Sequence, residues 1–369
     1  MKVLNLLTSG EAGGIESLCR DIGVNSEYDN GFCFLFSEGA IYDQMNKIGL
    51  KTYSLSKRTR KISIRKLFYL KKIVKEYDIV TVHHGDPFLK LYGILATIGT
   101  KKKMVTVVHS CYERKYFFPK SKLKFHFAHF MFRVGLNLSD LIIFVSNAGK
   151  ESYEKEFGLF KKNKTVVYNG ISMDKIQQGS KHKLPIDKPY KITYIGRLNY
   201  VKGVDYLIRA VSIVKEKYPI SVSIVGDGPD RNNLETLSKD IGVSDVVTFE
   251  GRHSNVIPFL EKTSVFVYPS IWNEVFGISL VEAMAFGIPC VSNRVGGIPE
   301  ILDDGKNGFL TKEKSDEALA EAICSVLEIL EQNEKVEDIS ICAKENANSF
   351  SIINTCDRLK EEYSKLIYA

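Results

Sequence analysis

Short apolar runs rich in β-branched residues recur along the first half of the chain, and stretches long enough for a helix separate them. The runs that we predict to be strands cover residues 2–7, 78–84, 103–110, 140–146 and 164–170. Strands that alternate with helices in this way are typical of a parallel sheet covered by helices on both faces.

The pattern breaks at a polar segment with two prolines, residues 181–189, and then starts again. From about residue 312 onward the chain is rich in Glu, Lys, Ala and Leu and helical in character. The second set of predicted strands covers residues 191–196, 221–226, 246–251, 264–270 and 289–293.

This repeat predicts two domains of the α/β class. We expect a first doubly wound domain at residues 1–180, a second at 188–350, and a C-terminal helix at 351–369 that packs back on the first domain. The length of 369 residues agrees with two domains, because ordinary domains hold roughly 100–200 residues. Ligands of such sheets bind beyond the carboxyl ends of the strands, so we expect the site in an interdomain cleft.

Composition narrows the class of protein. Apolar residues make up 44% of the chain and charged residues 26%, as in a soluble globular protein. No apolar run approaches the ~18 residues that span a bilayer, and the opening MKVLNLL is interrupted at Thr8-Ser9-Gly10, so we expect a cytoplasmic protein. The 7 cysteines are scattered without a CxxC pair, which favours reduced thiols over a zinc or redox site.

Charge is distributed unevenly along the chain. Residues 1–180 hold 29 Lys and Arg against 16 Asp and Glu, a net +13, and the remainder holds 22 against 28, a net −6. We therefore expect the first half to meet something anionic: nucleic acid, a membrane or a phosphorylated substrate.

Two glycine-rich turns follow predicted strands. In TSGEAGGIE (8–16), Gly13 and Gly14 precede a predicted helix, so their backbone N–H groups could approach a phosphate at the helix N-terminus. A tight turn between strand and helix explains the same glycines. The second stretch, VGDGP (225–229), lacks the third glycine of a dinucleotide fingerprint, and a turn suffices for it.

Two cations follow the first strand of the second domain. In YIGRLNYVKG (194–203), Gly196 ends the strand and Arg197 and Lys202 come after it. A guanidinium can grip phosphate oxygens with two hydrogen bonds, and an ammonium adds a point charge. The alternative is a solvated pair on the surface.

Two carboxylates frame a predicted helix within residues 273–300. The helix begins at Ser279 and ends before Gly287 and Pro289, and a capping box with Ser279 is the structural explanation for Glu282. Glu274, in the loop before the helix, has no such explanation. A phosphate near the amides of residues 278–280, with each carboxylate accepting hydrogen bonds from a diol, predicts a nucleotide sugar as ligand.

These residues resemble a known family. Glu274 and Glu282 in EVFGISLVEAMAFGIPCV are similar to the E-x7-E motif of the retaining glycosyltransferases of family four, whose two Rossmann-like domains form the GT-B fold. The resemblance extends over nearly the whole chain, through the Gly13-Gly14 loop, VHS with His109, VSNA with Ser146, VVYNGI, GRLNYVKG, VGDGP, FEGR, and VGGIPE with Glu300.

The resemblance implies roles for individual residues. Glu282 would hold the ribose and Glu274 the donor sugar, while Arg197 and Lys202 would neutralise the diphosphate. His109 would touch the donor sugar near its reacting carbon, so the implied catalytic residues are His109, Arg197, Lys202 and Glu274. The implied donor-binding residues are Gly13, Gly14, Gly196, Arg197, Lys202, Arg252 at the base, Glu274, Phe276, Gly277, Ile278, Ser279, Leu280 and Glu282.

Metal chemistry is not expected. No Asp-x-Asp motif occurs, and the His83-His84 and His126-x2-His129 pairs lack clustered carboxylates or thiolates, so we expect no metal site and no cofactor. Fixed cations would then stabilise the departing phosphate. The resemblance implies retention by attack on the face that the leaving group occupies, with the phosphate taking the acceptor's proton and no protein nucleophile.

Two basic segments of the first domain point to the acceptor. Residues 57–75 hold nine basic residues and no acid, and residues 112–134 hold eight aromatic and six basic residues against one acid. Such segments fit an anionic membrane or single-stranded nucleic acid, or a helix packed on the sheet with a solvated lysine face. Family members that build lipid-linked glycans favour the membrane, for which we single out Arg58, Arg60, Lys61, Arg65, Lys66, Phe117 and Phe118.

The preferred function is therefore a retaining, metal-independent hexosyltransferase. It would move a sugar from a UDP-sugar, or a GDP-sugar, to a glycan or lipid-linked acceptor, forming an α-linkage in cell-surface polysaccharide synthesis on the inner face of the plasma membrane. A sugar-nucleotide epimerase of the same fold would explain the donor site without an acceptor. A nucleic-acid-binding module would use the basic segments but leave Glu274, Glu282, Arg197 and Lys202 unexplained.

Overall fold

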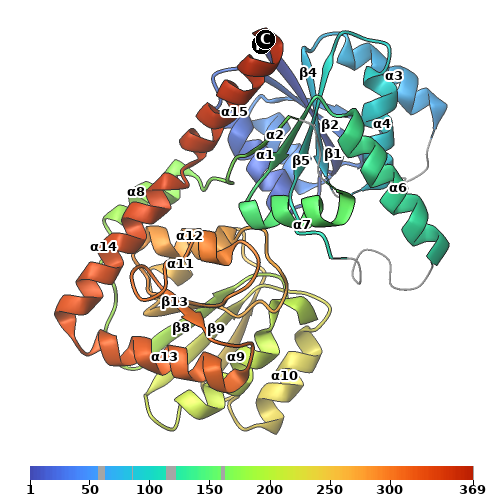
Figure 1. Ribbon diagram of the computed structural model, residues 1–369. Helices are drawn as coiled ribbons and strands as arrows, with labels where there is room; N and C mark the ends of the chain where they lie inside the picture. The colour runs from blue at the N-terminus through green and yellow to red at the C-terminus, as the bar shows by residue number, and fades with distance from the viewer. Residues whose placement is uncertain (57–62, 85, 114–121, 159–162, 369) are drawn as a thin grey trace. The chain divides into compact units, whose positions relative to one another are not determined.

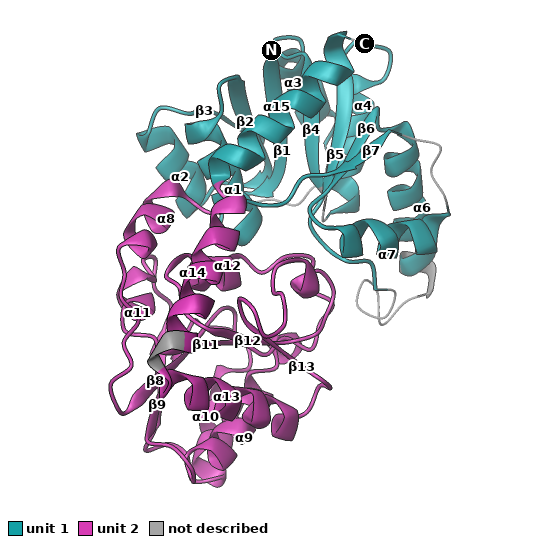
Figure 2. Cartoon of the chain, turned by 60° about the vertical axis from the view of Figure 1, so that its left-hand side comes forward, with its two compact units in different colours: residues 1–170, 352–369 teal, residues 171–351 magenta. Residues whose placement is uncertain are grey.

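The chain forms two compact units in a computed structural model (Figures 1 and 2). Unit 1 consists of residues 1–170 and 352–369, and unit 2 of residues 171–351. The structure describes residues 1–56, 63–84, 86–113, 122–158 and 163–368. In Figure 2 unit 1 is teal and unit 2 is magenta.

Unit 1 is built on a seven-stranded parallel sheet in the order β3-β2-β1-β4-β5-β6-β7. The strand order reverses between β1 and β4, the point where doubly wound sheets bind ligands at their carboxyl ends. The strands are β1 (Lys2–Ser9), β2 (Asp29–Ser37), β3 (Lys51–Ser54), β4 (Ile79–His84), β5 (Lys103–Val108), β6 (Leu141–Phe144) and β7 (Lys164–Val166).

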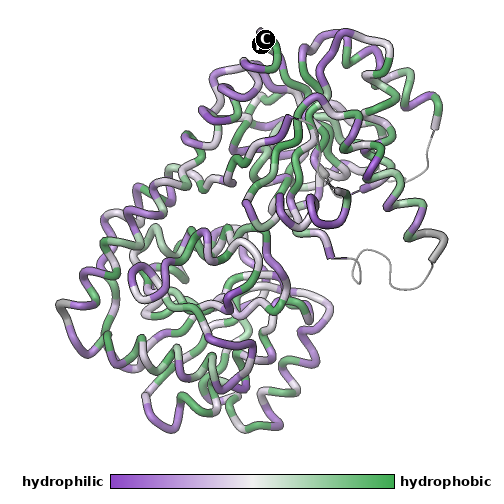
Figure 3. The backbone as a smooth tube through the Cα atoms, viewed as in Figure 1, coloured by the Kyte–Doolittle hydropathy of each residue, from purple (hydrophilic) through white to green (hydrophobic). Residues whose placement is uncertain are grey.

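Helices cover both faces of this sheet, as the alternating side chains of β2 show. Phe32 and Phe34 pack with α1 (Gly14–Asn25) and α2 (Ala40–Lys47), whereas Cys33 and Leu35 pack with α3 (Ile64–Val74) and α4 (Pro87–Thr97). Much of the sheet is therefore apolar, as the green segments in Figure 3 show. The remaining helices of unit 1 are α6 (Lys122–Leu138), α7 (Asn147–Phe157) and α15 (Ile352–Tyr368).

Unit 2 repeats this architecture with a six-stranded parallel sheet in the order β10-β9-β8-β11-β12-β13. Its strands are β8 (Tyr190–Ile195), β9 (Ile220–Val225), β10 (Val247–Gly251), β11 (Val265–Tyr268), β12 (Cys290–Asn293) and β13 (Phe309–Thr311). Its helices are α8 (Met173–Ser180), α9 (Val204–Val214), α10 (Arg231–Asp240), α11 (Ile257–Leu260), α12 (Ile278–Ala285), α13 (Asp316–Leu330) and α14 (Asn333–Ser349), with single 3₁₀ turns at η1 (Tyr200–Lys202) and η2 (Ile298–Glu300).

The α/β class and the two doubly wound sheets are confirmed. Every segment predicted to be a strand contains one, but β2, β3 and β13 were missed. The buried core of β2 is a continuous apolar run, which periodicity does not separate from a buried helix. β3 and β13 have only four and three residues, too short to show an alternation.

The division between the units differs from the predicted boundary at residues 181–189. Unit 2 begins at Ile171, because α8 packs on α12 and α14 of that unit. The approach is close: a Cβ atom on Gly179 would lie 2.3 Å from the carbonyl oxygen of Ala285. Residues 171–180 were therefore placed in the wrong domain, since the polar, proline-containing segment that follows them joins two elements of the same unit.

Residues 352–369 belong to unit 1, where α15 packs on α1. The ring of Tyr363 meets Tyr28 edge-on with 5.7 Å between centroids, and the Thr355 hydroxyl donates to the carbonyl oxygen of Tyr168 at 3.0 Å. The C-terminal helix thus closes the face of the sheet that α1 and α2 also cover.

Candidate active site

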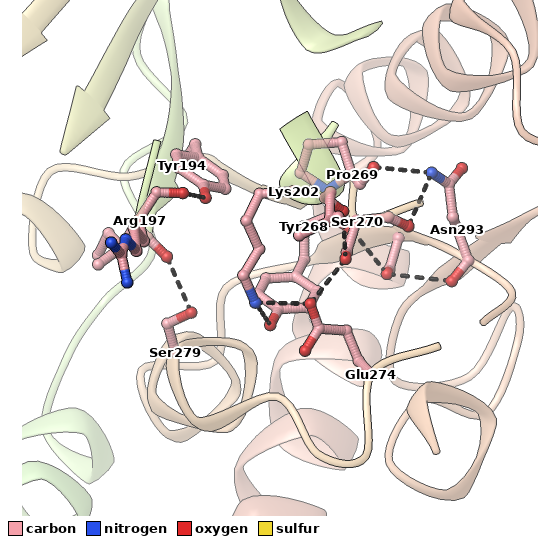
Figure 4. A network of polar contacts seen from close by, with 12 residues as sticks. Tyr194, Arg197, Lys202, Tyr268, Pro269, Ser270, Glu274, Ser279 and Asn293 are labelled. Atoms are coloured by element: carbon pink, nitrogen blue, oxygen red, sulfur yellow. Dashed lines mark hydrogen bonds and ion pairs between the residues drawn. The ribbon is translucent and has the colours of Figure 1, made fainter. Parts of the chain in front are cut away.

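An ion pair lies beyond the carboxyl ends of the central strands of unit 2 (Figure 4). Nζ of Lys202 is 2.6 Å from Oε1 of Glu274, and the same oxygen accepts a hydrogen bond from the Ser270 hydroxyl at 2.6 Å. The Glu274 side chain is 11% exposed and that of Lys202 23%. Burying a carboxylate to this degree costs free energy unless it has a partner and hydrogen bonds, and Glu274 has both.

Side chains of β12 hold the loop that carries Glu274. The Asn293 amide donates to the carbonyl oxygens of Pro269 and Ser270 at 2.8 and 3.2 Å, and the Ser292 hydroxyl donates to that of Tyr268 at 2.7 Å. The backbone N–H of Gly297 donates to the carbonyl oxygen of Glu274 at 2.7 Å. The carboxylate is therefore fixed from the strand beside it.

Glycine conformation brings Lys202 to the same loop. Gly203 adopts φ +64°, the left-handed region, at the end of η1. A Cβ atom there would lie 2.2 Å from the carbonyl oxygen of Pro269. Only glycine combines this turn with this approach, and the turn directs Lys202 toward Glu274.

Tyr268 completes the cluster. Its hydroxyl lies 3.5 Å from Nζ of Lys202. Burial, and then the neighbouring Glu274 carboxylate, raise the pKa of the Tyr268 phenol well above its ordinary value, so the hydroxyl stays protonated.

Glu282 forms a second ion pair, with Lys175 of α8. The carboxylate side chain is 9% exposed and the ammonium side chain 28%. The alternative explanation for Glu282, a capping box with Ser279, does not apply, because α12 begins at Ile278 after the N-cap Gly277. The Ser279 hydroxyl instead donates to the carbonyl oxygen of Ile195 at 3.0 Å, so it ties the helix to β8.

Among the described residues, no side chain caps the backbone N–H groups in the first turn of α12. Its N-cap is Gly277, and the helix follows directly at Ile278, Ser279 and Leu280. The positive end of a helix dipole and free amides form an anion-binding position. Phe276 is buried and meets Phe350 edge-on with 5.4 Å between ring centroids, so its ring belongs to the packing of unit 2.

Arg197 lies apart from the Lys202–Glu274 pair in Figure 4. Its side chain is exposed, and among the residues that the structure describes its guanidinium has no hydrogen-bond or ion-pair partner. The hydroxyl of Tyr194 donates to the Arg197 carbonyl oxygen at 3.1 Å, which fixes the backbone after Gly196. Arg252 is exposed directly after β10, at the same end of the sheet.

In unit 1, Gly13 is the N-cap of α1 and Gly14 its first residue. The carboxylate of Glu16 reaches back to this turn: a Cβ atom on Gly13 would lie 2.3 Å from its Oε2 atom. Burial raises the pKa of Glu16. A carboxylate thus occupies the region that the phosphate prediction assigns to an anion.

His109 follows β5 and faces His83 of β4. Nε2 of His109 lies 2.9 Å from Nδ1 of His83, and the rings stack at 5.2 Å between centroids. Burial lowers the pKa of His109 to about 4 and that of His83 well below its ordinary value, so both rings are neutral at pH 7.

The residues predicted for the acceptor and the membrane lie partly outside the described chain, which omits Arg58, Arg60, Lys61, Phe117 and Phe118. Arg65 is exposed on α3. The ammonium group of Lys66 lies 5.6 Å from the ring of Phe36, and burial lowers its pKa. Exposed apolar side chains stand nearby in the sequence, Ile64 and Phe68 on α3 and Phe127 and Phe130 on α6.

The described residues include neither a membrane-spanning helix nor a cluster of metal ligands. No helix there has both the length and the apolar character needed to cross a bilayer. No three or more His, Cys, Asp or Glu side chains gather there in a way that could hold a metal ion.

Several site residues were missed from the sequence. Lys175 was assigned to the other domain, and Ser270, Tyr268 and His83 lie in strands or strand ends where apolar neighbours dominate the pattern. The available signal was positional: polar side chains at the carboxyl ends of strands next to the reversal in strand order.

Relatives and solved structures point to one family. A model of the group 1 glycosyl transferases matches residues 176–344, and one described as glycosyltransferase family 4 matches residues 37–175. An uncharacterised glycosyltransferase of Haemophilus influenzae is 25% identical over 86% of this chain and 88% of its own. N-acetyl-alpha-D-glucosaminyl L-malate synthase of Bacillus anthracis is 29% identical over 68% of this chain and 65% of its own.

Structural neighbours share the fold. Anabaena Alr3699/HepE in complex with UDP aligns at a TM-score of 0.83 and 21% identity, covering 99% of this chain and 100% of that one. The lipopolysaccharide outer core galactosyltransferase WaaB aligns at 0.72 and 19% identity, covering 99% and 100%. Since the two adjoining family models match 37–344 and the fold is GT-B throughout, the chain belongs to the family 4 glycosyltransferases, enzymes that use a nucleotide-sugar donor.

Proposed function

We propose that this glycosyltransferase transfers a hexose from a UDP-sugar to a lipid-linked glycan acceptor with retention of anomeric configuration and without a metal or other cofactor. The observation that carries the proposal is the pair of buried carboxylates, Glu274 and Glu282, each held by its own lysine on either side of the uncapped first turn of α12. A nucleotide sugar has a diphosphate between the ribose diol and the hydroxyl groups of the sugar. The first turn of α12 lies between Glu282 and Glu274 in the same order.

Each carboxylate meets one diol in this proposal. Glu282 accepts hydrogen bonds from the ribose hydroxyls, and Lys175 holds it in place. Glu274 accepts from the hydroxyls of the donor sugar, and Lys202 holds it in place. Charge-assisted hydrogen bonds to ionised carboxylates are roughly twice as strong as neutral ones, so both ends of the donor are positioned.

The cations act on the leaving group. As the bond between the anomeric carbon and the phosphate oxygen breaks, that oxygen gains negative charge, which Arg197, Lys202 and the amides of α12 stabilise. The acceptor hydroxyl attacks from the same face, forms the new bond to the anomeric carbon, and passes its proton to the departing phosphate. We propose that His109 meets the sugar substrate and that no protein nucleophile is needed.

We propose uracil rather than guanine as the base of the donor. HepE was solved with UDP and with UDP-glucose, and the Bacillus anthracis relative is named for an N-acetylglucosaminyl group. Arg252 and the backbone after β10 are the residues proposed to meet the base.

The proposal for the acceptor is based on the surface of α3 and α6. Exposed Ile64, Phe68, Phe127 and Phe130 accompany cations in a unit with a net charge of +13 over residues 1–180. Apolar side chains that insert and cations that meet anionic headgroups fit a protein lying peripherally on the inner face of the plasma membrane. WaaB is named for the lipopolysaccharide core, and a fission yeast relative, 29% identical over 61% of this chain, for phosphatidylinositol.

The test is a donor screen followed by product analysis. Calorimetry with UDP-, GDP- and ADP-sugars should show binding to a UDP-sugar, which Glu282→Gln weakens and Glu331→Gln does not. Glu331 is the matched control, because it pairs with Lys188 on the exposed surface of unit 2. Incubation with membrane lipids should give an α-linked product, whereas a β-linked product would refute retention. Isomerised sugar nucleotide formed without acceptor would show an epimerase instead.

A further inference from the structure

A chain of polar side chains runs through the core of unit 1 to His109. Asn5 of β1 and His83 of β4 are 4% and 5% exposed. Oδ1 of Asn5 lies 3.2 Å from Nε2 of His83, and Nδ1 of His83 lies 2.9 Å from Nε2 of His109. These side chains meet because β1 and β4 are neighbours in the sheet and β4 and β5 are the next pair.

Backbone carbonyl oxygens determine which atom donates in each of these side-chain hydrogen bonds. A carbonyl oxygen only accepts, so the Asn30 amide nitrogen, 3.2 Å from the oxygen of Tyr28, must be its donor and leaves Oδ1 as an acceptor. The Asn5 amide nitrogen donates to Oδ1 of Asn30 at 3.0 Å, and the carbonyl oxygen of Gly31 lies 3.4 Å from it. Oδ1 of Asn5 therefore points at His83 as an acceptor.

The tautomers of both rings follow in turn. Because Asn5 accepts, Nε2 of His83 carries the proton, and in a neutral imidazole Nδ1 is then an acceptor. Nε2 of His109 must donate to that atom. The remaining ring nitrogen, Nδ1 of His109, is left as an acceptor, and no hydrogen bond to it is recorded among the described residues.

We propose that His83 is a positioning residue that holds His109 in the Nε2–H tautomer, so that Nδ1 of His109 accepts a hydrogen bond from a hydroxyl group of the sugar substrate. The tautomer follows from the geometry of unit 1 alone. The role in substrate binding rests on the proposed function.

Burial supports the neutral state that this argument needs. It lowers the pKa of both rings, and the neighbouring His109 lowers that of His83 further. Cys19 of α1 is the other titratable group against His83, with Sγ 3.4 Å from Nε2 and 3.7 Å from Nδ1. Burial raises its pKa, so it remains a thiol and puts no charge beside the ring.

The direct test is nitrogen-detected NMR of the full chain labelled with ¹⁵N-histidine at pH 7, with signals assigned by single-histidine variants. Both rings should show a protonated Nε2 and an unprotonated Nδ1. A protonated Nδ1 on His109 would overturn the proposal. This measurement needs no turnover, so it decides the tautomer even if no sugar is transferred.

Asn5→Asp should reverse the direction of the hydrogen bond between His83 and His109 without removing it. A carboxylate beside Nε2 favours the imidazolium form of His83, whose Nδ1–H then donates to Nε2 of His109 and forces the Nδ1–H tautomer. NMR should show this flip, and kcat/KM should fall about tenfold or more because a donor replaces the acceptor. An unchanged tautomer, or a flipped tautomer with unchanged kcat/KM, would contradict the proposal.

Donor analogues can distinguish whether His83 positions His109 or only stabilises the fold. His83→Phe removes the acceptor for His109, and its loss of kcat/KM should shrink for the one monodeoxy UDP-sugar that lacks the hydroxyl meeting Nδ1. An equal loss with every monodeoxy donor would indicate a merely structural residue. His182→Phe, which alters a histidine in unit 2, is the matched control and should leave kcat/KM unchanged.

Discussion

Nζ of Lys202 lies 2.6 Å from Oε1 of Glu274, and 89% of the Glu274 side chain is shielded from solvent (11% exposed). The lysine was expected to face phosphate and the carboxylate to face sugar, but in the free protein they neutralise each other. A donor that arrives with a diphosphate and hydroxyl groups can therefore bind both without leaving either charge unpaired.

Removing one partner of this ion pair should destabilise the folded protein. Lys202→Met leaves the Glu274 carboxylate unpaired and should lower the free energy of unfolding by about 1–3 kcal/mol, less than for a fully buried pair because Lys202 is partly exposed. Glu274→Gln in addition should restore most of that stability but no activity. Urea unfolding and transfer assays measure the two effects, with Lys188→Met and Glu331→Gln as the surface-pair control. Recovery of activity in the double variant would contradict the assigned roles.

Lys175 and Glu282 give a prediction about nucleotide binding. Glu282→Ala should leave a folded protein and lose about 2–4 kcal/mol of transition-state stabilisation, and Lys175→Met should weaken UDP binding roughly tenfold by freeing the carboxylate from its place. Calorimetry with UDP and with a 2′,3′-dideoxy analogue separates ribose recognition from folding. If Glu282→Ala only lowers the melting temperature, the pair is structural.

Hydrophobic periodicity and the positions of glycines predict part of this structure. The repeated strands, the turn at Gly203 and the loop carrying Glu274 all follow from local sequence. The partners of Glu274 and Glu282 do not, because Lys202 and Lys175 are respectively 72 and 107 residues away from them along the chain. Only the packing of α8 on α12 joins the second pair, and a polar linker after α8 concealed that packing.

Leaving-group stabilisation by fixed cations predicts metal independence. Activity should persist in excess EDTA, whereas Arg197→Ala should lower turnover more than it weakens binding of the free nucleoside, because the charge it meets grows as the bond breaks. Loss of activity on chelation with recovery in Mn²⁺ or Mg²⁺ would refute this mechanism.

The two histidines make stability depend on pH. The folded pKa of His109 is about 4, below the ~6.5 of an unfolded chain, so the unfolded state binds more protons between these values. Stability should therefore be complete above about pH 6.5 and fall as the pH drops toward 4, by roughly 2–3 kcal/mol from His109. His83 acts in the same direction. Urea unfolding at pH 5.0 and 7.5 should show a smaller difference in His109→Gln than in the wild type, and an equal difference would contradict the assignment.

Membrane attachment gives the last prediction. Each basic residue that reaches an anionic surface contributes about 1 kcal/mol, so the protein should sediment with anionic liposomes and much less with neutral ones. Ile64, Phe68, Phe127 and Phe130 are exposed, so some binding should persist in ~1 M salt, where the Debye length is about 3 Å.

Substitution of the two kinds of side chain should separate these contributions. Replacing Arg65, Lys71 and Lys72 by Ser should abolish the preference for anionic lipid, and Phe68→Ser with Phe130→Ser should remove the salt-resistant fraction. A second basic set, Arg58, Arg60, Lys61, Arg65 and Lys66, should lose the charge-dependent binding when replaced by Ser and keep the salt-resistant fraction. Serine at Lys239, Lys306 and Lys312, exposed in unit 2, removes the same charge as the first triple variant and is its control. Equal sedimentation of all variants would move the acceptor from lipid-linked glycans to soluble ones, because the α3 and α6 side chains would then play no part in membrane binding.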